Sequence, residues 1–113
     1  MTKLKRPIPK LLHPAPAIIT LTPDELRTLC RIQLEKCPHV MALAWAMDPL
    51  DWMHVYALVP EGSDRTDFAV AEARIEAAAP GQRLMLHRRE RFYPELPMER
   101  EFPIGAETYW RRP

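Results

Sequence analysis

Cysteine and glycine are scarce in this sequence, and their scarcity excludes several kinds of site. There are two cysteines and three glycines in 113 residues. Cys30 and Cys37 lie in one segment with helical patterning, about 10 Å apart along its axis, whereas a disulfide needs Cα atoms within roughly 7 Å. Their spacing matches no common zinc motif, and the sequence has neither a glycine-rich phosphate loop nor a nucleophile elbow. It therefore predicts no disulfide, no metal site, no cofactor and no identifiable catalytic residue.

Long apolar runs and excess charge are missing too. No apolar stretch approaches the roughly 20 residues that a membrane-crossing helix needs, and prolines interrupt the basic N-terminus where a signal peptide would have its apolar centre. The formal net charge is +1, with four basic and no acidic side chains in residues 1–20 and five basic against ten acidic ones in residues 21–80. We therefore expect a cytoplasmic protein without a membrane role, whose charge pattern suits self-association as well as nucleic-acid binding.

Proline is abundant instead, and it divides the chain. Residues 1–15 are basic and proline-spaced, which favours an extended arm. The remaining residues, 16–113, are enough for a single domain with a core of its own. The last part of this domain, from residue 94 onward, is again interrupted by proline. We expect that part to be irregular and held down by its apolar side chains, Phe102, Ile104, Tyr109 and Trp110.

Local patterns predict two helices and four strands. The clearest is the helix that follows Thr22 and ends before Pro38, since Thr22 and Glu25 form a capping box and Pro23 occupies the first helical position. A second helix follows a cap at residue 63 or 64 and ends at residues 79–81. Alternating or continuous apolar patterns predict the strands, at residues 17–21, 39–47, 51–60 and 82–93.

This β-α-β-β-α-β order matches the ferredoxin-like arrangement. In that α+β two-layer sandwich, two helices cover one face of a four-stranded antiparallel sheet. If residues 17–21 are not a strand, an α-β-β-α-β sandwich with the same two layers remains. A fold does not define an activity, so the function has to be sought on the surfaces.

The strand at residues 51–60 has one aliphatic and one aromatic face, because alternate strand residues point to opposite sides. The aliphatic set is expected beneath the helices, which leaves the aromatic face of the sheet open. If the small residues of strand 39–47 also lie beneath the helices, Trp45 joins this open face. The sequence then predicts seven binding residues on it: Trp45, Trp52, His54, Tyr56, Met85, His87 and Arg89.

Such a face is too apolar to remain bare in a monomer. Three kinds of cover are open: the protein's own C-terminal segment or N-terminal arm, a second copy of the chain, or a different macromolecule or small ligand. Aromatic, methionine and arginine side chains are the types enriched in protein interfaces. We therefore expect a non-catalytic protein-interaction module, a homodimer or a subunit that docks a protein partner, as an inhibitor or a toxin–antitoxin regulator would.

Two alternatives use the same face. Single-stranded nucleic acid is one, because aromatic side chains flanked by arginines can stack on bases and contact phosphates. A small dimeric α+β barrel enzyme is the other, with His54 or His87 beside Tyr56 as acid and base. The ferredoxin-like order places one strand between these histidines, so their backbones are expected about 10 Å apart.

Overall fold

The computed structural model describes residues 19–113, and the expected arm at residues 1–15 lies outside them. None of the described helices is long and apolar enough to span a membrane. In chain order the elements are α2 (Pro23–Leu34), β1 (Ala42–Met47), β2 (Met53–Pro60), α3 (Thr66–Ala78), β3 (Leu84–Arg91), the 3-10 helix η2 (Met98–Glu101) and β4 (Glu107–Arg111).

Helix α2 begins as the sequence predicts. The hydroxyl of Thr22 accepts a hydrogen bond from the backbone N–H of Glu25, and the Glu25 carboxylate accepts one from the backbone N–H of Thr22. This capping box satisfies N–H groups that have no partner inside the helix. Leu26, Cys30 and Leu34 form the buried stripe of the helix, which is the apolar spacing that an amphipathic helix needs.

The four strands form one mixed sheet in the order β3-β2-β1-β4. The pairs β1–β2 and β1–β4 are antiparallel, whereas β3 lies parallel to β2 and directly beside it. Helix α3 therefore makes the crossover that a parallel pair requires. The expected antiparallel, ferredoxin-like order is not found in residues 19–113, since that order would place β3 one strand further away. The coarser expectation holds, because two helices and one open sheet form an α+β structure compatible with a two-layer sandwich.

The edge of the sheet beside β1 is occupied by the C-terminal strand. Residues 19–21 form no strand, and residues 17 and 18 of the expected first strand lie outside the described part of the chain. Instead β4, in a segment that we expected to be irregular, pairs with β1, with a register shift between Leu43 and Ala44. The observed order is therefore the alternative α-β-β-α-β order extended by one strand.

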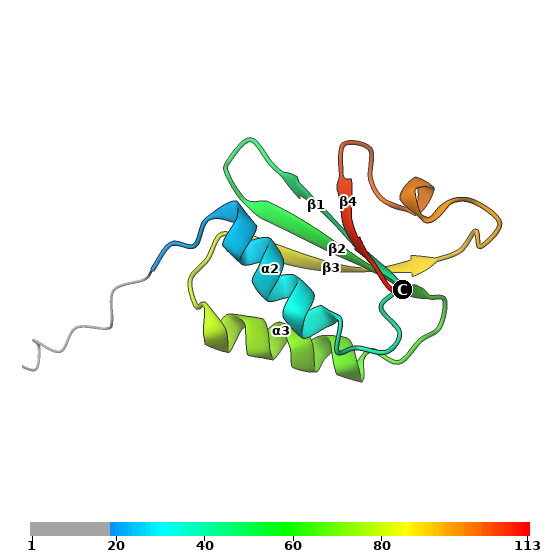
Figure 1. The fold of residues 1–113 in the computed structure, drawn as a ribbon, viewed down its shortest axis with the longest axis horizontal. Helices are drawn as coiled ribbons and strands as arrows, with labels where there is room; N and C mark the ends of the chain where they lie inside the picture. The colour runs from blue at the N-terminus through cyan, green and yellow to red at the C-terminus, as the bar shows by residue number, and fades with distance from the viewer. Residues whose placement is uncertain (1–18) are drawn as a thin grey trace, which may run out of the picture.

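Helices α2 and α3 lie on one side of the sheet (Figure 1), and the core fills the space between the helices and the sheet. It contains the aliphatic side chains of β2 and, from β1, Leu43 and Trp45. Trp45 is half-buried, with the guanidinium carbon of Arg27 4.1 Å from its ring centroid. The expectation that Trp45 lies on the open face is therefore wrong. The small alanines of β1 are on the other face, so the condition under which Trp45 would join the open face is not met.

The chain itself covers part of that other face. Residues 92–106, which we call the covering segment, connect β3 to β4 and include η2 (Figure 1). The side chain of Phe102 is buried there against Ala42, Ala44 and Leu58. Small side chains on β1 let the aromatic ring approach the backbone of the sheet closely. One of the three expected covers, the protein's own C-terminal segment, is thus present over one half of the face.

Two sets of contacts, one made by Glu101 and one by Arg112, hold the C-terminal part of the chain in place. The buried carboxylate of Glu101 accepts a hydrogen bond of 3.0 Å from the backbone N–H of Tyr93 and lies 3.9 Å from Nε of Arg91. After β4, the guanidinium of Arg112 donates to three backbone carbonyls between α2 and β1, those of Glu35, Cys37 and Val40, at 2.7–3.0 Å. A cation is favourable there, because carbonyls at the end of a helix have no partner inside it.

Candidate functional site

The candidate site is the part of the open face that the covering segment does not protect. We call it the uncovered half. The parallel register of β2 and β3 places His54 beside Met85 and Tyr56 beside His87, all on one face. The residues of the uncovered half are Asp48, Trp52, His54, Tyr56, Met85, His87 and Arg89, of which Tyr56 and Arg89 adjoin the covering segment.

Asp48, at the start of the β1–β2 turn, organises one end of this site. One carboxylate oxygen, Oδ1, accepts hydrogen bonds of 2.9 Å from the backbone N–H groups of Leu50 and Trp52. The other, Oδ2, lies 2.9 Å from Nε2 of His54. These contacts, led by the one to His54, hold the pKa of Asp48 below its ordinary value. The carboxylate is therefore ionised at neutral pH and has a fixed direction.

The two histidines lie end to end. Nδ1 of His54 is 2.9 Å from Nε2 of His87, and the two ring planes differ by only 16°. Their centroids are 5.1 Å apart, which is the nitrogen–nitrogen distance plus the two ring radii. The rings are therefore nearly coplanar and joined by an in-line hydrogen bond, and they do not overlap face to face. Asp48, His54 and His87 form a continuous chain of hydrogen bonds, which we call the relay.

The charge on Asp48 sets the direction of the relay. With His54 neutral, its proton is on Nε2, where the carboxylate accepts it, and its Nδ1 then accepts the Nε2 proton of His87. Nδ1 of His87 is left with a lone pair, and it makes no hydrogen bond within residues 19–113. Burial, followed by repulsion from His54 when that ring is protonated and from the charge of Arg89, lowers the pKa of His87 below its ordinary 6.5. His87 is therefore a neutral imidazole with an available basic nitrogen at neutral pH.

The remaining residues form the surroundings of the relay. The ring of Tyr56 stacks on that of His87, with centroids 4.7 Å apart and planes that differ by 17°. Arg89 is exposed and is held by a 2.9 Å hydrogen bond from its Nε to the backbone carbonyl of Glu101. Met85 and Trp52 are exposed large apolar side chains at the rim. The site thus combines a polar centre with an apolar rim.

The structure brings together six of the seven binding residues that the sequence predicts, and Trp45 is the exception. The expected 10 Å separation of His54 and His87 is wrong, because β3 pairs directly with β2. Sequence reasoning also missed Asp48, which is not among the predicted binding residues. The available signal was its position six residues before His54, where a tight hairpin turn returns the chain to the same end of the sheet.

The cysteines make no site. Both thiols are free and buried in the core between the helices and the sheet, and Sγ of Cys37 donates to the backbone carbonyl of Asp67. Burial raises the pKa of Cys30 to about 12, and burial followed by the charge of Asp67 raises the pKa of Cys37. In the described part of the chain, no three histidine, cysteine or acidic side chains are grouped as metal ligands would be.

The fold and the relay together define a small two-layer α+β protein with a histidine-centred sheet face. Comparison with known proteins adds no further assignment. No family model, no curated protein and no solved structure matches the chain.

Proposed function

We propose that the uncovered half is a protein-binding surface and that its partner is a second copy of this chain. The observation that carries the proposal is the incomplete cover of the open face. Phe102 and its segment protect the alanine-rich half, whereas Met85 and Trp52 remain 45 % and 36 % exposed on the other half. Adjacent exposed apolar side chains with aromatic and arginine neighbours are typical of an interface centre.

The charges of the uncovered half favour a second copy over an unrelated partner. In a two-fold dimer the same patch meets itself, so it has to be complementary to itself. The half carries an anionic side chain, Asp48, at the turn end of β2 and a cationic one, Arg89, further along β3. An antiparallel meeting of two copies brings each carboxylate toward the guanidinium of the other copy, with Met85 and Trp52 between them.

The proposal is tested by the mass of the protein in solution. Wild-type protein is expected to show the mass of a dimer by light scattering, and Met85→Glu is expected to show the mass of a monomer, because it buries an unpaired charge in the interface. Val70→Glu is the matched control. Val70 is 42 % exposed on α3, on the opposite side of the sheet, and its substitution should leave the dimer intact.

A monomeric wild-type protein would contradict this proposal. Single-stranded nucleic acid is then the partner to examine, and binding should weaken steeply as salt is added. Loss of that binding on Arg89→Gln, together with a monomeric mass, would move the function to nucleic-acid recognition.

A second candidate function, acid–base catalysis, is favoured by the in-line relay. His87 can act as the base by accepting a proton on its Nδ1. It can then pass its own Nε2 proton to His54, and the ionised Asp48 stabilises the resulting imidazolium of His54. The same division of roles operates when a carboxylate orients a catalytic histidine.

Hydrolysis of an activated ester, p-nitrophenyl acetate, tests the second candidate. If His87 acts as a base, it takes a proton from water, the hydroxide oxygen adds to the carbonyl carbon and the phenolate leaves. His87→Gln should abolish the enzymatic rate while the mass stays dimeric, and Asp48→Asn should lower the rate by at least tenfold. A rate equal to that of free imidazole at the same concentration of histidine would exclude catalysis without affecting the dimer proposal.

A further inference from the structure

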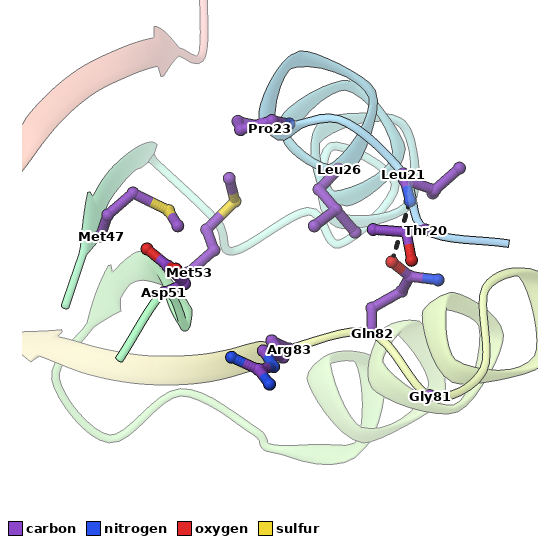
Figure 2. A pocket seen from close by; sticks show the side chains of 10 residues that line it. All are labelled: Thr20, Leu21, Pro23, Leu26, Met47, Asp51, Met53, Gly81, Gln82 and Arg83. Atoms are coloured by element: carbon purple, nitrogen blue, oxygen red, sulfur yellow. Dashed lines mark hydrogen bonds between the residues drawn. The ribbon is translucent and has the colours of Figure 1, made fainter. Parts of the chain in front are cut away.

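A separate cavity lies on the helix side of the sheet. It has a volume of about 300 Å³, is partly open to solvent, and lies between the start of α2, the β1–β2 turn and the loop between α3 and β3 (Figure 2). The chain that enters α2 is fastened to its rim by Gln82. The side-chain oxygen of Gln82 accepts the backbone N–H of Leu21 at 3.1 Å, and its amide nitrogen donates to the carbonyl of Ile19 at 2.6 Å. The cavity is thus bounded by secured parts of the fold.

Apolar side chains line part of this cavity. Leu26 extends into it from α2, and Met47 and Met53 extend from the ends of β1 and β2 (Figure 2). Met53 is almost fully buried, whereas Met47 is 42 % exposed, so the lining is fixed on one side and adaptable on the other. Methionine side chains can fit ligands of different shapes because they are flexible and polarisable.

Two opposite charges line the same cavity. Arg83 is held in position by a 3.0 Å hydrogen bond from Nη1 to the backbone carbonyl of Leu50, which leaves its other donors available. Asp51 follows in the same turn and also lines the cavity (Figure 2). Within residues 19–113, Arg83 and Asp51 form no ion pair with each other or with other groups. Both charged groups therefore remain available to a ligand.

The turn alone does not require a carboxylate at Asp51. Asp51 has a φ of +64°, in the left-handed region, and is the one non-glycine residue of the described chain with a positive φ. Glycine adopts this conformation without strain, and asparagine tolerates it as well as aspartate. The backbone at this position needs no negative charge, and yet one is present at the rim of an apolar cavity.

We propose that this cavity binds a small zwitterion with an apolar side chain, of the class of the aliphatic α-amino acids. The guanidinium of Arg83 receives the carboxylate, and the carboxylate of Asp51 receives the ammonium group. The aliphatic side chain lies among Leu26, Met47 and Met53. The volume is at the lower end of the range for small-molecule pockets, roughly 300–1,000 Å³, which fits a ligand of this size. The proposal does not depend on the dimer, because no residue of the uncovered half lines the cavity.

Isothermal titration of the full chain tests the charge requirement. L-leucine and L-methionine are expected to bind with a dissociation constant of about 1 mM or below. 4-Methylpentanoate lacks the ammonium group of leucine and 3-methylbutylamine lacks its carboxylate, so each should bind at least tenfold more weakly. The dipeptide Leu-Gly tests whether the cavity binds a free amino acid or the N-terminus of a peptide. The proposal commits to the free amino acid, so the dipeptide should also bind more weakly.

Matched variants locate the binding. Arg83→Gln and Asp51→Asn should each weaken leucine binding at least tenfold, whereas Arg65→Gln and Glu61→Gln, exposed at the opposite end of β2, should not. Asp51→Gly is a second test, since it removes the charge and also the strain of a positive φ. It should abolish leucine binding and raise the melting temperature. Equal binding of leucine and both analogues, or no saturable binding of leucine or methionine, would overturn the proposal.

Discussion

The imidazoles of His54 and His87 are joined end to end across two neighbouring parallel strands, with 2.9 Å between Nδ1 of the first and Nε2 of the second. Burial of the ring, the neighbouring His54 and the nearby Arg89 make protonation of His87 unfavourable in the folded protein. Its pKa is therefore lower than 6.5, the ordinary value that applies in the unfolded chain. The difference links the stability of the fold to pH.

We predict that the fold loses stability as the pH falls through 6.5. In that range the unfolded chain has a protonated His87 and the folded chain does not, so the unfolded state binds more protons and acid favours it. A second loss, from the lowered pKa of Asp48, begins only below the ordinary value of 3.8. Melting temperatures between pH 8 and pH 5 measure the first effect.

The control for this prediction is another histidine. His87→Gln should flatten the fall in melting temperature between pH 7 and pH 5, whereas His39→Gln should not, because His39 is exposed. If His87→Gln keeps the wild-type slope, protonation of His87 does not cause the loss of stability. Titration of the histidine ring protons by NMR would then identify the group responsible.

Local features of the fold could be predicted from the sequence, and long-range pairing could not. The start of α2 depends on Thr22, Pro23 and Glu25, which are neighbours in the chain, and it formed as expected. The order of the sheet depends on whether β3 pairs with β2 or lies one strand away. Both arrangements bury the same alternating side chains of β3, so periodicity does not distinguish them. The relay was missed for this reason, since His54 and His87 meet only in the observed order.

The second strand shows another limit. In β1 the bulky set, with Leu43 and Trp45, and the alanine set are both covered, one by the helices and one by Phe102. Side-chain size therefore did not indicate which face was open. The decisive partner, Phe102, lies far along the chain in a proline-rich segment whose contacts have no sequence period.

Phe102 is expected to hold the covering segment on the sheet. Phe102→Ala should reduce the free energy of unfolding by about 3–4 kcal/mol, as for other buried phenylalanines, and should increase binding of the dye ANS as the alanine face is exposed. The ring is 7 % exposed. Urea denaturation measures the change in the free energy of unfolding. Ile104→Ala is the control in the same segment, because Ile104 is fully exposed. If Ile104→Ala changed the free energy of unfolding by more than about 0.5 kcal/mol, the segment would not pack through Phe102 alone.

Arg112 is expected to contribute more than its exposed position suggests. It donates to three backbone carbonyls in the connection between α2 and β1, and a planar guanidinium suits such a cluster better than an ammonium group. Arg112→Lys should therefore lower the free energy of unfolding by about 1–2 kcal/mol. Arg111→Lys keeps its exposed ion pair with Glu99 and should change stability by less than about 0.5 kcal/mol. Equal effects of the two substitutions would show that the carbonyl cluster does not need the guanidinium.

The two cysteines are expected to be unreactive in the folded protein, and their reaction with iodoacetamide measures how the core opens. Alkylation requires the thiolate, and the raised pKa values of Cys30 and Cys37 keep both thiols protonated at neutral pH. Cys30 has no exposed surface and Cys37 is 4 % exposed, so both should react fully in urea and far more slowly in native buffer.

Cys37 should react before Cys30, because it lies after the end of α2, where local opening costs less than unfolding the core. Because the Arg112 guanidinium bonds the carbonyl of Cys37, Arg112→Lys should accelerate alkylation of Cys37 and leave that of Cys30 governed by global unfolding. Mass spectrometry of peptides from timed samples separates the two rates. Equal rates for both cysteines in the wild-type protein would mean that the end of α2 opens only when the whole domain unfolds.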